Sequence, residues 1–172
     1  MLESREEGKA CLVQTKDSIY ESTSLKEVKI NDSKNGYFVL DNGVSIKSKD
    51  VIAYQNKRGY FFCISDYYPV KFAHRTEKGN ICYYSVSFQD PRGARVDQFH
   101  TETKHLRYLQ KKGTLALYDF GYDNMKWMVG DYKPSLDLLE KYAQASRFKK
   151  DDMLLWNAMV EYNKAVKEGR TK

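Results

Sequence analysis

The three histidines and three cysteines of this sequence are the first residues to test for metal binding or catalysis. His100 and His105 lie in a polar stretch close to Asp97 and Glu102. A spacing of five places two side chains about 140° apart on a helix and on opposite faces of a strand. Neither regular structure lets the two imidazoles share a metal ion, and only a loop could bring them together. The sequence therefore predicts no metal site and no cofactor.

Nucleophilic catalysis needs a thiol or hydroxyl within reach of a base. The sequence offers Cys63 or Cys82 with His74. Cys82 shares its strand face with Tyr84 and other apolar residues, which favours a buried, inert thiol. Signature motifs of hydrolases, phosphate-binding loops and zinc proteases are absent from the sequence. A non-enzymatic protein is favoured and no catalytic residue is assigned. A hydrolase that uses carboxylates distant in sequence is an alternative, because paired carboxylates leave no sequence signature.

Aromatic residues flanked by a cation are the candidates for ligand binding. Arg58-Gly59-Tyr60-Phe61-Phe62 overlaps the signature of the RNA-recognition motif, in which strand aromatics stack on bases. The match fails at Phe61, where a small residue is required, and that motif also needs a helix between its first two strands. We predict a strand that follows a glycine turn, with Arg58, Tyr60 and Phe61, together with Tyr83, as ligand-binding residues.

Composition gives only broad limits on the ligand. The net charge of +6 would favour anionic partners, but charged residues of both signs make up 30% of the chain. Fourteen tyrosines suit half-buried strands, binding surfaces and wet interfaces alike. No apolar run is long enough for a transmembrane helix. The three cysteines are too few for a disulfide scaffold. An unknown protein or glycan partner is therefore expected, and nucleic acid is an unfavoured alternative.

Strand patterns dominate about residues 10–118. Asn42-Gly43 separates two alternating runs and predicts a hairpin. Ile81–Phe88 alternates with period two, so Cys82, Tyr84, Val86 and Phe88 share one face. Val96–Lys112 is ambiguous between strand and helix, and Leu115–Tyr118 is expected to be a closing strand. The pattern indicates an antiparallel meander or small barrel. Weaker strand patterns cover the remaining segments: Ala10–Gln14, Ser18–Tyr20, Val51–Tyr54, Tyr60–Ile64 and Tyr68–Ala73.

Helical periodicity replaces the strand pattern after Tyr118. Asp123 and Gly130 predict the cap residues of a short helix, and Pro134 marks the start of a second. The third helix is expected from Asp151, with apolar residues at the i, i+3, i+4, i+7 spacing. The chain is thus expected to be one α+β domain over 1–172, with a helical tail at 122–168 covering the apolar face of the sheet. The apolar residues of this tail suit a core, or alternatively a partner groove, and they include Met125, Trp127, Met128, Trp156 and Met159.

The run from Tyr122 to Tyr132, with Leu138–Tyr142 and Trp156–Tyr162, resembles the C-terminal part of uncharacterised exported proteins of gut bacteria. Their tail ends in E-x-Y-N, and this chain has the shorter Glu161-Tyr162-Asn163. The second helix starts differently, with Tyr132-Lys133-Pro134. The resemblance implies a β-rich body and a place outside the cytoplasm, whereas the N-terminus lacks the apolar segment of a signal peptide. We expect a non-enzymatic envelope or secreted binding or structural protein; a cytoplasmic nucleic-acid-binding module is the alternative.

Overall fold

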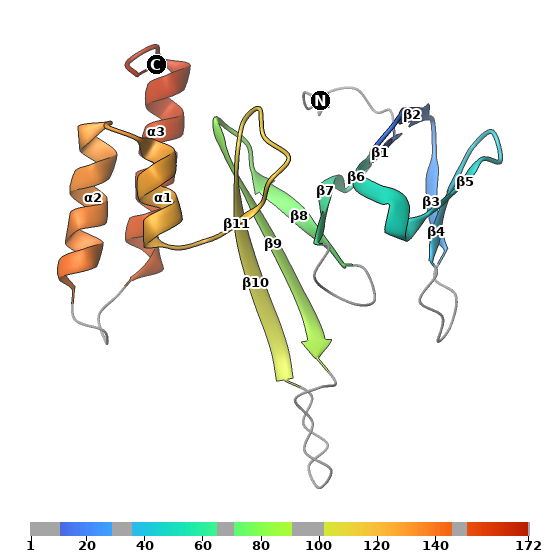
Figure 1. Ribbon diagram of the computed structural model, residues 1–172, viewed down its shortest axis with the longest axis horizontal. Helices are drawn as coiled ribbons and strands as arrows, with labels where there is room; N and C mark the ends of the chain where they lie inside the picture. The colour runs from blue at the N-terminus through green and yellow to red at the C-terminus, as the bar shows by residue number, and fades with distance from the viewer. Residues whose placement is uncertain (1–10, 29–35, 65–70, 91–101, 146–150, 172) are drawn as a thin grey trace, which may run out of the picture. The chain divides into compact units, whose positions relative to one another are not determined.

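The computed structural model describes residues 11–28, 36–64, 71–90, 102–145 and 151–171, which form an α+β fold. The chain divides into two compact units, residues 1–75 and residues 76–172. Figure 1 shows the strands along the first part of the chain and the helices along the last part. The expected order of strands followed by helices is confirmed. The division between the units falls within a strand, not between the strands and the helices.

The first unit contains an antiparallel sheet whose strand order is β8-β7-β6-β1-β2. Its alternation is clearest in β7, where Tyr60, Phe62 and Ile64 are buried and the residues between them are half-buried. A tight turn joins β6 to β7 at Asn56–Gly59, where the sequence predicted a glycine turn before the strand. The order is linear, so the described strands of this unit form an open sheet rather than a barrel. The strands are β1 (Cys11–Thr15), β2 (Ile19–Ser22), β6 (Val51–Asn56), β7 (Gly59–Ile64) and β8 (Lys71–Glu77).

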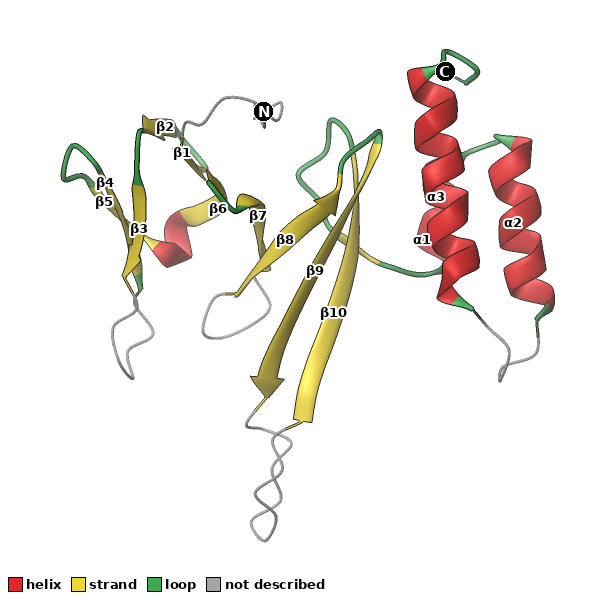
Figure 2. Ribbon diagram, turned by 180° about the vertical axis from the view of Figure 1, so that it is seen from behind, coloured by secondary structure: helices red, strands yellow, loops and turns green. Residues whose placement is uncertain are grey.

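A smaller sheet in the same unit consists of β3 (Leu25–Val28), β4 (Tyr37–Leu40) and β5 (Ser45–Lys47). The Asn42-Gly43 turn joins β4 to β5 as predicted, and Gly43 adopts the positive φ of 80° that such turns require. Figure 2 shows these three strands drawn together in yellow. Their buried side chains pack with those of the larger sheet in one cluster, which contains Val13, Phe38, Leu40, Ile46, Val51 and Tyr54.

Asp41, at the end of β4, fixes the turn between β2 and β3. Its carboxylate accepts hydrogen bonds from the backbone N–H of Thr23, at 2.8 Å, and from the Thr23 hydroxyl. The Thr23 hydroxyl contributes most to holding the pKa of Asp41 at about 2. These bonds stabilise the ionised carboxylate and so contribute to the free energy of unfolding. The contribution is fully present at pH values above the ordinary carboxyl pKa and disappears as the pH falls through about 2.

We therefore expect the carboxyl carbon of Asp41 to titrate with a midpoint of about 2 in a pH series of NMR spectra. Thr23→Ala removes the hydroxyl bond but keeps the backbone bond, so the midpoint should rise partway toward the ordinary value. A midpoint in the ordinary carboxyl range for the unmodified protein would show that the Thr23 hydrogen bonds do not stabilise the ionised Asp41 carboxylate.

The second unit combines the β9–β10 hairpin with three helices. Its strand order is β11-β10-β9, with an antiparallel register that runs from Ile81↔Lys111 to Asp90↔Glu102. Figure 2 shows the hairpin as two long strands and α2 beside α3. The elements are β9 (Ile81–Asp90), β10 (Glu102–Lys111), β11 (Tyr118–Asp119), α1 (Tyr122–Val129), α2 (Lys133–Gln144) and α3 (Asp152–Lys167).

The helix ends follow the predicted signals with one correction. Asp151 caps α3, because its side chain accepts a hydrogen bond from the Met153 backbone N–H at 2.8 Å. Gly130 ends α1 with a φ of 60°, as expected. The N-cap of α1 is Gly121, however, and Asp123 lies within the first turn. There its carboxylate still favours the positive end of the helix dipole.

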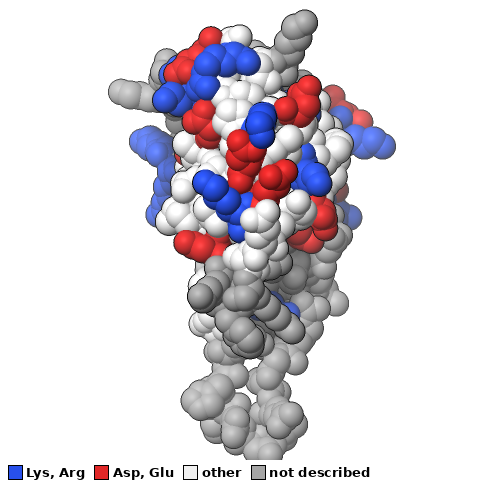
Figure 3. Space-filling view, turned by 90° about the vertical axis from the view of Figure 1, so that its left-hand side faces the viewer, with Lys and Arg blue, Asp and Glu red and all other residues white. Residues whose placement is uncertain are grey.

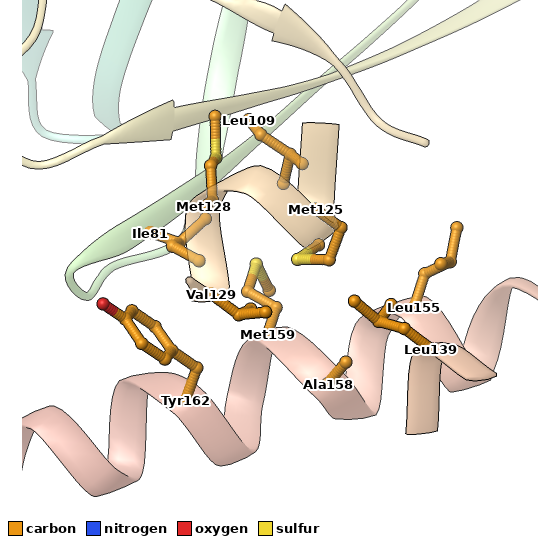
Figure 4. Packing of buried hydrophobic residues seen from close by; sticks show 10 residues of the cluster. All are labelled: Ile81, Leu109, Met125, Met128, Val129, Leu139, Leu155, Ala158, Met159 and Tyr162. Carbon is orange, nitrogen blue, oxygen red and sulfur yellow. The ribbon is translucent and has the colours of Figure 1, made fainter. Parts of the chain in front are cut away.

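The core of the second unit lies between the base of the hairpin and the helices. Figure 4 shows side chains from α1, α2 and α3 converging on Ile81 and Leu109. The three methionines of this cluster are fully buried, so the core interpretation of those tail residues is confirmed. The cluster consists of Ile81, Leu109, Met125, Met128, Val129, Leu139, Leu155, Ala158, Met159 and Tyr162.

The structure assigns the two segments that the sequence left open or misplaced. The described part of Val96–Lys112 is strand from Glu102 onward, and residues 96–101 lie outside the described residues. The closing strand begins only at Tyr118 and is two residues long, because it pairs only with Tyr108 and Leu109. The helices pack on the face that carries Ile81 and Leu109, opposite the face on which Cys82 and Tyr84 alternate.

Candidate functional site

The two faces of the β9–β10 hairpin differ in character. Odd-numbered residues form the face on which the helices pack, and at the base this face is apolar. Farther along the hairpin the same face becomes polar, and we call this part the polar strip: Ser85, Ser87, Gln89, Thr103, His105 and Arg107. All of these side chains are exposed except that of Ser85, which is half-buried. The even-numbered face is apolar and buried or half-buried over Cys82, Tyr84, Val86 and Phe88.

The polar strip ends at three half-buried rings that we call the aromatic corner: Tyr83, Phe120 and Trp156. Tyr83 comes from β9, Phe120 follows β11, and Trp156 comes from α3. The Tyr83 ring meets Phe120 edge-on, with centroids 5.2 Å apart, and meets Trp156 edge-on at 5.1 Å. Edge-to-face packing is a favourable arrangement for aromatic quadrupoles, so these rings hold one another in place.

Arg107 joins the polar strip to the aromatic corner. Its guanidinium carbon lies 5.0 Å from the Phe120 ring centroid, and its Nη1 donates to Asp152 Oδ2 at 2.6 Å. Burial raises the pKa of Tyr83, while the charge of Arg107 partly offsets the shift. The corner thus presents a phenol, a guanidinium and a carboxylate beside apolar rings.

Two cross-strand pairs occupy the outer part of the strip. Ser87 lies directly opposite His105, and their Oγ and Nδ1 atoms are 2.7 Å apart. Gln89 Nε2 donates to Thr103 Oγ1 at 3.0 Å. A serine beside a histidine could transfer a proton, but both side chains are exposed, so water competes for every bond that they form. Nucleophilic catalysis also needs a third group that orients the histidine, so this pair by itself offers hydrogen bonds to a ligand.

The four predicted ligand-binding residues lie in both units. Arg58, Tyr60 and Phe61 belong to the first unit and Tyr83 to the second. Tyr60 is only 5% exposed, and the guanidinium carbon of Arg75 lies 4.3 Å from its ring centroid. Phe61 stacks on Tyr54, with centroids 4.7 Å apart and ring planes 7° apart.

Arg58 lies in the exposed turn between β6 and β7, and its carbonyl oxygen is 3.1 Å from His74 Nε2. The described elements before β7 are strands and one short 3-10 helix (Ser48–Asp50). Tyr83 lies in the aromatic corner. A ligand-binding role for Arg58, Tyr60 and Phe61 stays a prediction, and the candidate site described above is built on Tyr83.

Sequence reasoning missed most of the residues around Tyr83. Phe120 follows β11, whereas Asp152 and Trp156 both lie on α3, and only the fold brings these two segments to the β9–β10 hairpin. The residues Thr103, His105 and Arg107 are polar at every second position, which would have indicated one exposed face had Val96–Lys112 been read as a strand.

Of the residues considered for metal binding, His105 belongs to the polar strip, where it pairs with Ser87. Within the described ranges, no three His, Cys, Asp or Glu side chains are placed to hold a metal ion. His100 lies outside the described residues. All three cysteines are free thiols, and burial raises the pKa of Cys63, which makes its thiolate less available.

No protein-family model, curated protein or solved structure matches this chain. None of the described helices combines the length and the apolar character needed to cross a membrane. The interpretation of the site therefore depends on its geometry and chemistry.

Proposed function

We propose that this protein is a non-enzymatic, extracytoplasmic glycan-binding protein whose ligand lies along the polar strip and against the aromatic corner. One observation carries the proposal: the exposed half of the β9–β10 face holds only hydrogen-bonding side chains and ends at three packed rings. The proposed location outside the cytoplasm rests on the resemblance of the helical tail to exported proteins.

A glycan matches this combination of groups. Sugar hydroxyls donate and accept hydrogen bonds around the edge of the ring, while the C–H groups give the ring an apolar face. Ser87, Gln89 and Thr103 can donate and accept, as hydroxyls require. Residues two apart on a strand are spaced about 6.8 Å apart, so the strip offers repeated contacts to an extended polymer. The aromatic corner supplies apolar surface for one sugar ring.

Nucleic acid is supported less well by the same surface. Arg107, the permanently charged residue of the strip, already pairs with Asp152. On the face that carries α2, Lys and Arg side chains alternate with Asp and Glu side chains (Figure 3). Phosphate binding favours an accumulation of cations, and it weakens steeply as salt rises. Absence of binding to a mixed single-stranded RNA pool at low salt would exclude this alternative.

Native gel electrophoresis through gels that contain soluble polysaccharides tests the proposal. We expect at least one neutral or acidic polysaccharide to retard the protein, and Gln89→Ala and His105→Ala each to weaken retardation about tenfold. Loss of one hydrogen bond to the ligand, about 1.4 kcal/mol, corresponds to a factor of ten. Purified peptidoglycan sacculi, assayed by co-sedimentation, extend the test to envelope glycan.

Gln144→Ala in α2 is the matched control, because it makes the same exposed replacement outside the strip. Exposed substitutions of this kind change stability by less than about 0.5 kcal/mol, so all variants should remain folded. The proposal fails if no polysaccharide or sacculus binds. It also fails if the two strip variants bind as the unmodified protein does, or if only salt-sensitive RNA binding is found.

A further inference from the structure

Arg107 and Asp152 form a charge pair where the polar strip meets the aromatic corner. Arg107 Nη1 lies 2.6 Å from Asp152 Oδ2, and the two side chains are 41% and 47% exposed, so a ligand can reach both groups. Burial raises the pKa of Tyr83, the charge of Arg107 lowers it, and the charge of Asp152 raises it. The charges that act on the corner are therefore opposite in sign and largely cancel.

The pair keeps hydrogen-bonding capacity for a ligand. Asp152 Oδ2 accepts from Arg107, and among the described residues its Oδ1 atom has no hydrogen-bond partner. A guanidinium carries five N–H donors, so Arg107 can donate to Asp152 and Tyr83 and still donate to a ligand. The Phe120 ring, 5.0 Å from the guanidinium carbon, supports the position of Arg107. A carboxylate acceptor and guanidinium donors thus lie side by side.

Adjacent hydroxyls of a sugar ring match this arrangement. A hydroxyl carries one O–H donor and two acceptor lone pairs, so one hydroxyl can donate to Asp152 while its neighbour accepts from Arg107. Hydrogen bonds to charged groups are stronger than those between neutral groups. A neutral sugar can form both bonds while the ion pair stays intact.

A charged sugar meets a repulsive group at the same place. A carboxylate that approaches Arg107 also approaches the carboxylate of Asp152, and an ammonium that approaches Asp152 also approaches Arg107. Like charges placed together at an interface weaken binding and exclude the wrong ligand. An uncharged sugar avoids both penalties.

We infer that the proposed site selects neutral glycans, and that Asp152 and Arg107 determine this specificity by binding two adjacent hydroxyls of one sugar. The inference rests on the proposed glycan-binding function and names its substrate class. An uncharged polymer has no counterion atmosphere to release, so its binding should change little between low and high salt.

Polysaccharides that share a backbone and differ in charge test the substrate class by affinity electrophoresis. The pairs are hydroxyethyl cellulose with carboxymethyl cellulose, dextran with carboxymethyl dextran, and methyl-esterified with de-esterified polygalacturonate. In at least one pair, the neutral member should bind the full chain at least about tenfold more strongly than the acidic member. The net charge of +6 attracts any polyanion, so retardation counts as binding at the site only where Gln89→Ala weakens it.

The inference and the proposed function fail in different ways. Site-dependent binding in which no neutral member is preferred over its acidic counterpart would overturn the inference and leave the glycan site in place. Absence of site-dependent binding to every polysaccharide and to sacculi would contradict the proposed function, and the inference with it.

Asp152→Asn tests the role of the charge pair. The substitution removes the carboxylate acceptor, keeps the size of the side chain and leaves Arg107 without its counter-charge. Binding of the neutral polysaccharide should weaken about tenfold, as expected for loss of a hydrogen bond to a charged group, whereas binding of the acidic counterpart should strengthen. Unfolding would weaken both, so the opposite changes distinguish ligand recognition from a structural role.

Asp137→Asn in α2 is the matched control. Asp137 is 48% exposed and its Oδ1 lies 2.8 Å from Lys133 Nζ, so the same replacement breaks a similar ion pair away from the site. Exposed ion pairs contribute little to stability, so both variants should remain folded. Asp137→Asn should bind both polysaccharides as the unmodified protein does. Unchanged neutral binding in Asp152→Asn, or an equal loss in Asp137→Asn, would overturn the inference.

Discussion

Asn163→Ala should lower the free energy of unfolding of the second unit by roughly 2–6 kcal/mol, because it leaves two buried backbone groups without partners. The Asn163 side chain, on α3, accepts a hydrogen bond from the Ile81 N–H and donates one to the Ile81 carbonyl, each at 2.8 Å. Ile81 is fully buried at the start of β9. Urea unfolding followed at 222 nm measures the effect, since every described α-helix belongs to this unit.

Gly79→Ala should lower the free energy of unfolding nearly as much as Asn163→Ala, because it breaks the same two hydrogen bonds. A Cβ atom at Gly79 would lie 2.3 Å from Cγ of Asn163 and would displace the amide. Adding Gly79→Ala to Asn163→Ala should then cost little, because the obstructing side chain is gone. Asn163→Asp retains the acceptor but sets a carboxylate oxygen against the Ile81 carbonyl oxygen, so more than half of the loss is expected. Additive effects of the two alanine substitutions would show that the steric contact is not the cause.

Phe38→Ala should lower the free energy of unfolding of the first unit by about 3–5 kcal/mol, the usual cost of truncating a buried phenylalanine. Phe38 is 0% exposed, and its ring meets Tyr54 at 4.7 Å and Phe72 at 5.6 Å. The substitution removes the ring that contacts both neighbours and leaves a cavity in the cluster. Because the rings of Tyr54 and Phe72 both lose contacts, partial relaxation of the cluster into the cavity does not restore those contacts.

Hydrogen exchange measured by mass spectrometry locates this effect in β4, β6 and β7. Protection there should fall at least a hundredfold, because 1.4 kcal/mol corresponds to a factor of ten. Val44→Ala, at the nearby exposed turn, is the control and should change protection little. An effect of Phe38→Ala no larger than that of Val44→Ala would contradict the assigned core.

The helical region was predicted well because its signals are local. The period of α3 places Leu155, Ala158, Met159 and Tyr162 on one side, and those residues form its buried face. The cap at Asp151 depends on a side chain that bonds two residues ahead. The cap of α1 was placed two residues too late because Gly121, the true cap, makes no side-chain bond. A cap without a side chain leaves no specific signal in the sequence.

The strand region was predicted less completely because strands take their pairing from distant residues. β3, over Leu25–Val28, was missed since its two central residues are charged and exposed. β10 was ambiguous because its polar residues do not alternate clearly with apolar ones. Its partner β9 stabilises it as a strand through ten paired residues. The strand state of such a segment depends on backbone bonds to another segment.

The candidate site shows the same limit. Tyr83 was selected as an aromatic strand residue, but its neighbours Phe120 and Trp156 are far from it in sequence. Trp127 and Met128 are adjacent large apolar residues of α1. Only packing shows that Trp127 is exposed and Met128 is buried.

The sequence by itself determined the order of strands and helices, the Asn42-Gly43 turn and the apolar side of α3, because these follow from residues a few positions apart. Tertiary structure alone decided which face of β9 the helices cover. That choice depends on Ile81 and Leu109, which lie on the odd-numbered face at the hairpin base. The apolar residues Cys82 and Tyr84 lie on the other face. The outer part of the odd-numbered face remains exposed and polar, because its Ser, Thr, Gln, His and Arg side chains gain more from water than from burial.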